Sequence, residues 1–340
     1  MKNEKKAWIL LFGFVFIIAA SLGFFNLTLD SANQLHFCKN NEKKVAEAIM
    51  NGQPVYFINH PNERLCKEEL IKILPDHFDT VAIGASLLMT VNKEMLGLEN
   101  GEFYNLGVSG MNLKDYMNTL GMMKYYGKEA DNYIFLLHID VFLPNDDGRN
   151  EIQKQYGAYY LDYLNGKDSQ IKSNFLFNTV KDELKTFFSV SYFQENLQFY
   201  REHGLRKSIM IGGNHLEHHY MSDASWVYSE EYQSRSVKDV IEDIKNGGAE
   251  YMPKTHVDKE NFILFDRIIH DLLKQGKKII LYFPPYCPSL YAAYPPQNSP
   301  CFKEIEDFIS RYKNEKNITI LGSFYPQKCG LSDENFYDAR

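Results

Sequence analysis

The sequence predicts an α/β domain of three layers, with helices on the faces of a largely parallel β-sheet. Apolar runs rich in β-branched residues recur as strand candidates at residues 80–83, 133–140, 278–283 and 318–321. Helical spacing of apolar residues fills the intervals at 111–126, 261–275 and 300–312. Strands that alternate with helices along a chain are typical of a parallel sheet, and 340 residues are enough for a large core.

The N-terminus carries a candidate membrane anchor. Three lysines lie within the first six residues, and residues 7–25 form a run of 19 without a charge. At about 1.5 Å per residue this helix would be about 28 Å long, enough to cross a bilayer core. The lysines favour a cytoplasmic N-terminus, which places everything after Asn26 outside. A signal peptide cleaved near Ala20 and a buried helix of a soluble protein are the alternatives.

Composition narrows the classes of partner. A net charge of −7 and a pI near 5.8 argue against nucleic acid as the main partner. The 14% of aromatic residues suits a thick core, and it also suits an amphipathic groove for sugars or acyl chains. The five cysteines allow disulfides outside the cytoplasm, within the pair Cys38 and Cys66 and within the pair Cys287 and Cys301, with Cys329 left over.

The remaining chain divides into a short juxtamembrane region and the α/β domain. Residues 26–75 contain a short helix at 40–50 and a short strand at 54–58, and residues 76–340 form the domain. A helix is expected to begin within 88–96, and Asn112 is the expected N-cap of the helix at 111–126. Residues 141–252 are rich in charges and tyrosines, so we interpret them as a helical insertion that acts as a lid or a docking surface.

Residues 78–110 carry the chemistry around which the domain is organised. The first strand ends in Gly84-Ala85-Ser86-Leu87, and the next strand ends in a loop from Asn105 to Gly110 that contains two glycines. A serine at one strand end and main-chain N–H groups at the next are the minimum parts for acyl transfer. The alternative for Ser86 is a small residue that caps a helix after a strand.

These segments resemble the conserved blocks of the SGNH/GDSL hydrolases. Gly84-Ala85-Ser86-Leu87 is similar to the GDSL block, with alanine at its aspartate position, and Asn105-x-Gly107-x-x-Gly110 is similar to the second block. Residues 335–340 resemble the approach to the Asp-x-x-His block, with Asp338 as the aspartate. The resemblance implies a flavodoxin-like SGNH sandwich. It is closest to the membrane-anchored members found beside polysaccharide O-acyltransferases in bacterial envelopes.

The resemblance also assigns roles. Ser86 is the implied nucleophile, and the main-chain N–H groups of Ser86 and Gly110 are the implied oxyanion donors, with Asn105 beside them. The third block normally supplies an asparagine as a further donor, whereas the matching strand here ends in Asp140. An ionised aspartate cannot donate, so Asp140 is expected to bind a substrate hydroxyl or to position a helix, and Asn145 is an alternative donor.

The catalytic base is the open question of this pattern. In the Asp-x-x-His block the histidine would follow Arg340, so we expect it in residues that continue the chain, with Asp338 orienting it. His138 is the alternative base, because it lies at the end of a core strand. The third alternative is a pseudoenzyme.

The other histidines and aromatic residues are expected to be structural. The segment His215-Leu216-Glu217-His218-His219 does not have the HExxH spacing of zinc proteases, so solvated histidines are favoured over a metal site. Trp226 and Tyr228 either pack in the core or stack on sugar. The turn at residues 284–286 resembles a loop on the active-site rim of the family, or is a plain rigid turn.

The resulting hypothesis is serine-dependent transfer or hydrolysis of acyl esters on a cell-envelope glycan, without a metal or an organic cofactor. By resemblance alone, a multispanning membrane acyltransferase is the expected protein partner. A non-catalytic glycan-binding or assembly protein with the same fold is the alternative from another class. A soluble carbohydrate or lipid esterase is a third possibility, and the expected anchor argues against it.

Overall fold

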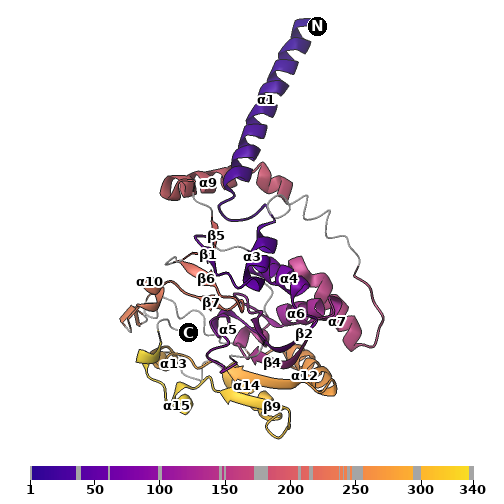
Figure 1. Cartoon of the computed structure of the whole chain (residues 1–340), viewed down its shortest axis with the longest axis vertical. Helices are drawn as coiled ribbons and strands as arrows, with labels where there is room; N and C mark the ends of the chain where they lie inside the picture. The colour runs from indigo at the N-terminus through magenta and orange to yellow at the C-terminus, as the bar shows by residue number, and fades with distance from the viewer. Residues whose placement is uncertain are drawn as a thin grey trace.

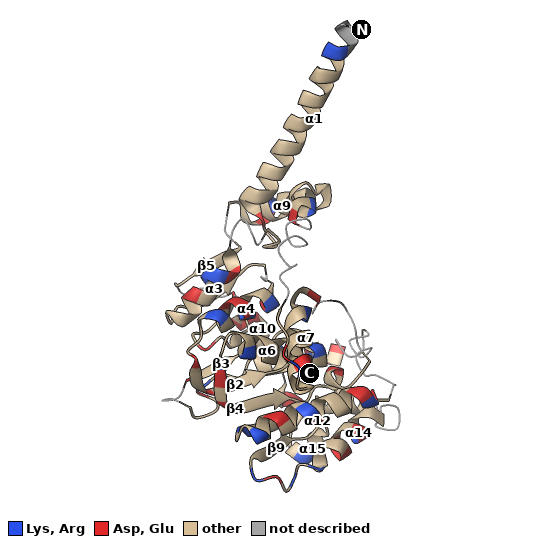
Figure 2. Ribbon diagram, turned by 90° about the vertical axis from the view of Figure 1, so that its right-hand side faces the viewer, with Lys and Arg blue, Asp and Glu red and all other residues tan. Residues whose placement is uncertain are grey.

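The computed structural model describes residues 2–35, 40–59, 62–98, 102–144, 148, 151–171, 183–205, 208–213, 217–236, 238–239, 241–242, 246, 256–293 and 300–336. One long helix, α1 (Lys2–Leu29), projects from a head that contains the other elements, as Figure 1 shows. Within α1, residues Lys5–Leu29 have a mean hydropathy of 2.5 and are long and apolar enough to cross a membrane. In Figure 2 this helix is free of charge except near its outer tip.

The head is built on a five-stranded parallel sheet. Its strands are β2 (His77–Ile83), β3 (Phe103–Asn105), β4 (Glu129–Leu136), β8 (Lys278–Phe283) and β9 (Ile318–Gly322). They lie in the order β3-β2-β4-β8-β9, and every neighbouring pair is parallel. Counted along the chain, the order is 2-1-3-4-5, one of the two common orders of doubly wound sheets. The predicted α/β class with a parallel sheet is confirmed.

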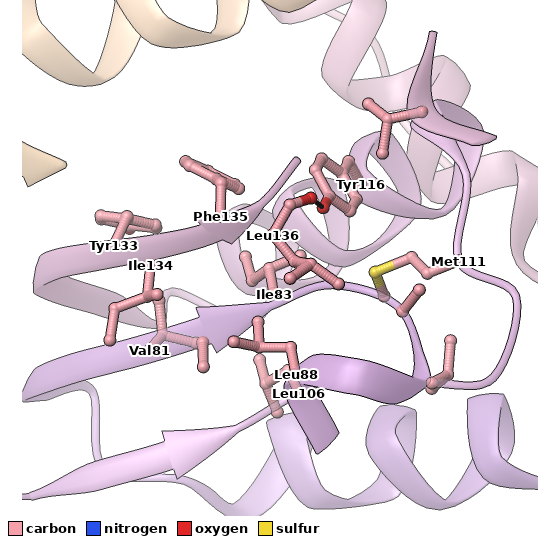
Figure 3. Close-up of a cluster of buried hydrophobic side chains, with 14 of the residues drawn as sticks. Val81, Ile83, Leu88, Leu106, Met111, Tyr116, Tyr133, Ile134, Phe135 and Leu136 are labelled. Carbon is pink, nitrogen blue, oxygen red and sulfur yellow. Dashed lines mark hydrogen bonds between the residues drawn. The ribbon is translucent and has the colours of Figure 1, made fainter. Parts of the chain in front are cut away.

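Helices cover one face of this sheet. They are α6 (Leu113–Tyr125), α7 (Lys154–Leu164), α12 (Lys259–Lys274) and α14 (Pro300–Ser310), and α7 packs on α6 rather than on the sheet. Phe135 of β4 contacts Tyr116 of α6 and Phe265 of α12. The Tyr116 hydroxyl also donates to the Leu136 carbonyl at the end of β4, as Figure 3 shows. Asn112 caps α6 as predicted, in a capping box with Asp115.

The helix expected to begin within residues 88–96 is absent, which corrects the prediction. The structure has only one turn there, α5 (Ser86–Met89), followed by turns at 93–97. The reason is the buried side chain of Asn105. Its Nδ2 donates to the main-chain carbonyls of Leu88, Met89 and Val91 at 2.7, 3.2 and 2.9 Å and so holds this segment in a turn, in which Val91 N donates to Leu88 O at 3.0 Å.

The insertion expected to be helical also contributes strands to a second, antiparallel sheet, which corrects that prediction. Its order is β5-β1-β6-β7, formed by β1 (Val55–Phe57), β5 (Ile209–Ile211), β6 (His218–Tyr220) and β7 (Trp226–Val227). The insertion therefore contains three strands besides α7, α9 (Val190–His203) and α10 (Glu230–Gln233). Strands of two or three residues are too short to show a period of two, and β1, the partner of β5 and β6, lies far away in the sequence.

The segment from residue 26 to residue 75 contributes β1 to the second sheet, and it also contains two helices. Its helices α3 (Asn41–Met50) and α4 (Glu63–Ile73) pack together, and α4 also contacts α6. The remaining elements are short: η1 (Ile139–Val141), η2 (Glu151–Gln153), α13 (Pro288–Ala293), α15 (Pro326–Cys329) and η5 (Asp333–Asn335).

The four described cysteines are free thiols, so the suggested pairing of Cys287 with Cys301 is absent. Instead, the Cys287 thiol lies 3.0 Å from a carboxylate oxygen of Asp333. The suggested partner of Cys66, Cys38, lies outside the described residues.

Candidate active site

The site lies where the direction of strand order reverses, between β2 and β4. In doubly wound sheets, ligands bind outside the carboxyl ends of the strands at this point. Ile83, the last residue of β2, is paired in register with Phe135 of β4. Ser86 follows Ile83 by three positions, and His138 follows Phe135 by three positions. The two strands therefore deliver a serine and a histidine to the same edge of the sheet.

Ser86 is the first residue of α5 and is partly exposed. Its main-chain N–H has no acceptor inside the helix, because the first N–H groups of a helix never do. Within the part of the chain that the structure describes, its hydroxyl has no hydrogen-bond partner either. Both groups are thus available to a substrate, which a purely capping serine would not offer.

The loop after β3 brings main-chain N–H groups to the same edge. Leu106 N donates to Ala82 O at 2.8 Å and Val108 N donates to Gly84 O at 3.1 Å, so the loop follows β2 past the end of β3. At Gly107 a Cβ atom would lie 3.0 Å from the Gly84 carbonyl oxygen, tighter than side chains normally allow. Gly110 follows at φ 59°, in the left-handed region that glycine tolerates best.

Asn105 positions both segments and does not point at a substrate. Its side chain is fully buried, its Nδ2 is committed to three carbonyls of the segment after Ser86, and its Oδ1 accepts from Gly107 N at 2.9 Å. One side chain therefore fixes the serine turn to the glycine loop. We assign Asn105 to positioning, rather than to the oxyanion or substrate contact expected from the sequence.

A charged layer behind the glycine loop holds it from the other side. The Glu63 carboxylate accepts from Ser109 N at 2.6 Å and from the Ser109 hydroxyl at 3.0 Å. Arg64 donates from Nε and from an Nη to the two carboxylate oxygens of Asp115, both at 2.8 Å. Both side chains of this ion pair are nearly buried, at 9% and 2% exposed. Two consecutive residues of α4 thus clamp the loop that carries Gly110.

Lys67, one turn further along α4, is a buried cation under the site. Its Nζ donates to the carbonyls of Asn105 and Ala224, both at 2.7 Å, and lies 4.5 Å from the centre of the Tyr220 ring. Burial lowers the pKa of Lys67 to about 8, although the Glu63 carboxylate opposes the shift. Lys67 therefore ties the second sheet to the end of β3, a role that nothing in the sequence pattern signalled.

His138 and Asp140 form a pair at the end of β4. His138 is 8% exposed, and its Nδ1 accepts from Asp140 N at 3.3 Å and lies 3.2 Å from Oδ2 of Asp140. As an acceptor Nδ1 carries no proton, so the proton of the neutral ring is on Nε2 in this geometry. To act as a base held by the Asp140 carboxylate, the ring would take the other tautomer, with the proton on Nδ1. The sequence offered His138 as an alternative base, but it did not offer Asp140 as its partner.

The loop after β8 forms a further part of this edge. Asp333 accepts from Ser289 N at 2.8 Å and from the Ser289 hydroxyl at 2.5 Å, besides its contact with Cys287. Burial and this carboxylate raise the pKa of the Cys287 thiol to about 11, which makes it a poor nucleophile at neutral pH. Asp338 and Asn145 lie outside the described residues.

The aromatic and histidine alternatives make their contacts around the second sheet. Trp226 is 3% exposed and stacks on Phe57 within the second sheet, so its ring serves packing. His218 Nδ1 accepts from Ser229 N at 3.0 Å. Among the described residues, no group of three or more metal-binding side chains occurs.

In comparisons with known proteins, no family model matches the chain and no curated protein matches it. The site is therefore interpreted from its own geometry. A free serine hydroxyl, two main-chain N–H groups and a carboxylate-paired histidine are the parts of nucleophilic acyl chemistry.

Proposed function

We propose that the chain transfers or hydrolyses acyl esters through Ser86. The observation that supports this most strongly is the equivalent placement of Ser86 and His138 on the paired strands β2 and β4, with Asp140 beside the histidine. A serine hydroxyl is a weak nucleophile until a base removes its proton, so a serine and a carboxylate-held histidine at one edge are a functional combination.

Each of these residues has one role in the proposed reaction. His138 Nε2 takes the proton of the Ser86 hydroxyl as its oxygen attacks the acyl carbonyl. The N–H groups of Ser86 and Gly110 stabilise the oxyanion that forms. Collapse of this intermediate breaks the ester bond, and the leaving oxygen takes the proton from His138. A second hydroxyl, from water or from a sugar, then attacks the acyl-serine with the same proton transfers and frees Ser86.

The proposed setting is the outer face of a membrane. α1 would cross the bilayer and keep the head close to it, and the sequence resemblance supports a cell-envelope glycan as acceptor or ester. A multispanning membrane acyltransferase as partner rests on the same resemblance. By the same resemblance, another histidine oriented by Asp338 is the rival to His138 as the base in this proposal.

A non-catalytic function on the same fold is the second candidate. One observation favours it: the position where the resembled family has an asparagine donor holds Asp140, which cannot stabilise an oxyanion when ionised. In that case the edge between β2 and β4 would bind a glycan without reacting with it.

A serine-reactive fluorophosphonate probe tests the proposal on the membrane-embedded full-length protein. We expect labelling of the natural protein, its complete loss in Ser86→Ala and its retention in Ser310→Ala, an exposed serine at the end of α14. His138→Ala should lower the labelling rate at least about 100-fold if His138 is the base. Absence of labelling in the natural protein would favour the non-catalytic candidate, and unchanged labelling in His138→Ala would move the base to another histidine.

A further inference from the structure

The foot of α1 is built into the head by a segment that we call the collar, residues 184–205. Asn26 of α1 is fully buried there. Its Nδ2 donates to the carbonyls of Phe187 and Ser189, both at 3.0 Å, and its Oδ1 accepts from Asn196 Nδ2 at 3.2 Å. A buried asparagine with this many partners fixes one geometry, because a buried amide left unpaired is costly.

Contacts on either side of Asn26 strengthen this joint. The rings of Phe25 and Phe193 lie 4.7 Å apart, and the Tyr192 hydroxyl donates to Asp30 Oδ1 at 2.5 Å. Asn196 Oδ1 also accepts from Ser31 N at 2.8 Å, just beyond the end of α1. In Figure 1, α9 lies across the foot of α1, so the collar crosses the direction of the helix.

The collar exposes large apolar side chains that the fold does not cover. They are Leu184 (53%), Phe188 (48%), Val190 (61%), Tyr200 (45%) and Leu205 (76%). On α9, Val190, Phe193, Leu197 and Tyr200 recur at helical spacing and form one stripe, whereas Glu195, Gln198 and Glu202 are exposed on another side. α9 is thus amphipathic in addition to the face that it buries with Tyr192, Asn196 and Phe199.

Part of the apolar side of the collar faces α1. Tyr200 and Leu205 line a groove of about 630 Å³ together with residues of α1 that include Ala20 and Phe24. Ala20 lies six residues before the buried Asn26, about 9 Å further along the helix at 1.5 Å per residue. Tyr200 and Leu205 therefore reach the level of the last turns of the apolar stretch.

We propose that the collar lies in the lipid–water interface of the membrane that α1 crosses. The proposal rests on α1 spanning the bilayer, but not on the chemistry at Ser86. Lipid is the occupant that fits, because the exposed apolar surface is continuous with α1, only 6% of whose apolar window is buried by the protein. An amphipathic helix with its apolar side at the acyl boundary and a tyrosine near the headgroups is the usual form of such a contact.

The proposal has a mechanical consequence. One helix through the bilayer leaves a head free to tilt, whereas a second element lying in the membrane plane removes that freedom. Because Asn26 and Asn196 lock the two elements together, the edge that carries Ser86 is held at one height and one angle to the membrane.

Tryptophan quenching by brominated lipids tests this on the full-length chain in phosphatidylcholine vesicles. In a Trp8→Phe background, whose remaining Trp226 is buried in the head, Tyr200→Trp reports on the apolar stripe and Gln198→Trp reports on the polar side two residues away. We expect the lipid to quench the Tyr200→Trp signal at least about twofold, with a blue-shifted emission, and to leave Gln198→Trp unquenched. Val190→Trp provides a second reporter on the stripe if Tyr200→Trp does not fold.

Three results would overturn the proposal. In one, the stripe reporters are quenched no more than Gln198→Trp. In another, they are shielded from both brominated lipid and aqueous acrylamide, which would assign the stripe to a protein partner or a second copy. In the third, the natural Trp8 is not quenched by the lipid, which shows that α1 does not span and removes the premise, whatever the outcome of fluorophosphonate labelling.

Discussion

Replacing Arg64 with methionine should destabilise the head strongly and loosen the loop that carries Gly110. Methionine keeps much of the volume and the helix propensity of arginine, so the change removes mainly the charge and the hydrogen bonds. Arg64 donates to both carboxylate oxygens of Asp115 and, at 3.4 Å, to the Ser109 carbonyl. After the change, the main-chain N–H of Asn112, at 3.1 Å, is the one remaining donor to the buried Asp115 carboxylate among the described residues.

The expected loss in the free energy of unfolding is about 3–5 kcal/mol, because breaking a buried ion pair leaves one charge without a counter-charge. Two charge-assisted hydrogen bonds of about 1.5–3 kcal/mol each give about 3–6 kcal/mol, which overlaps this range. For a domain stabilised by about 5–15 kcal/mol, this is a large fraction. Arg64→Lys keeps the charge but loses the planar fork of N–H donors that matches a carboxylate. Its free energy of unfolding should therefore lie between those of the natural protein and Arg64→Met.

Urea unfolding of the detergent-solubilised full chain in a Trp8→Phe background, followed by the fluorescence of buried Trp226, measures the loss. The matched control is the double variant Arg64→Met with Asp115→Leu, in which no lone buried charge remains. It should be more stable than Arg64→Met alone, since apolar replacements of buried ion pairs are often nearly neutral. A loss below about 1 kcal/mol in Arg64→Met, or a double variant less stable than the single one, would refute the reasoning.

Three further predictions concern other parts of the head. Gly121→Ala should lower the free energy of unfolding by about 1–3 kcal/mol in urea titrations, because a Cβ would lie 2.0 Å from the Tyr156 carbonyl oxygen; a neutral effect would contradict the close packing of α6 on α7. Lys67 has its folded pKa near 8, below the unfolded value of 10.5, so the unfolded chain binds more protons in that window and stability rises with pH. The contribution of Lys67 to the free energy of unfolding should grow by about 2 kcal/mol from about pH 8 to about pH 10. If the free energy of unfolding of the natural protein and that of Lys67→Met changed equally over this range, the lowered pKa of Lys67 would be contradicted. Asp333→Asn should speed alkylation of Cys287 by iodoacetamide at about pH 8, because the carboxylate that raises the thiol pKa is gone; an unchanged rate would exclude this cause.

The parallel sheet was predictable because its signals are local. The strand expected at 278–283 coincides with β8, and the one at 318–321 differs from β9 by one residue. Each is a continuous apolar run of the kind that a sheet buried by helices requires. The N-cap at Asn112 was equally local, since a cap depends on residues three positions apart.

The missed features depend on contacts between distant residues. The helix expected at 88–96 is stopped by Asn105, whose effect on those carbonyls cannot be read from the segment itself. The pairing of Asp140 with His138 depends on the turn geometry of η1 rather than on a motif. For Lys67, an amphipathic position in α4 is compatible with a solvated lysine, and only the approach of the second sheet buries it.

The second sheet sets the order in which the head can be completed. β1 leaves the ribosome early, yet its partners β5 and β6 belong to residues 209–220, and the Tyr56 hydroxyl donates to Gly213 O across 157 positions. Until that later part has been made, both edges of β1 stay unpaired, a state prone to association with other chains. Because α1 precedes β1, the proposed anchor would hold this unpaired strand beside the membrane while the rest of the chain is made. Closure of the second sheet is then a late step in maturation, and it is the step that buries Lys67 beneath the site.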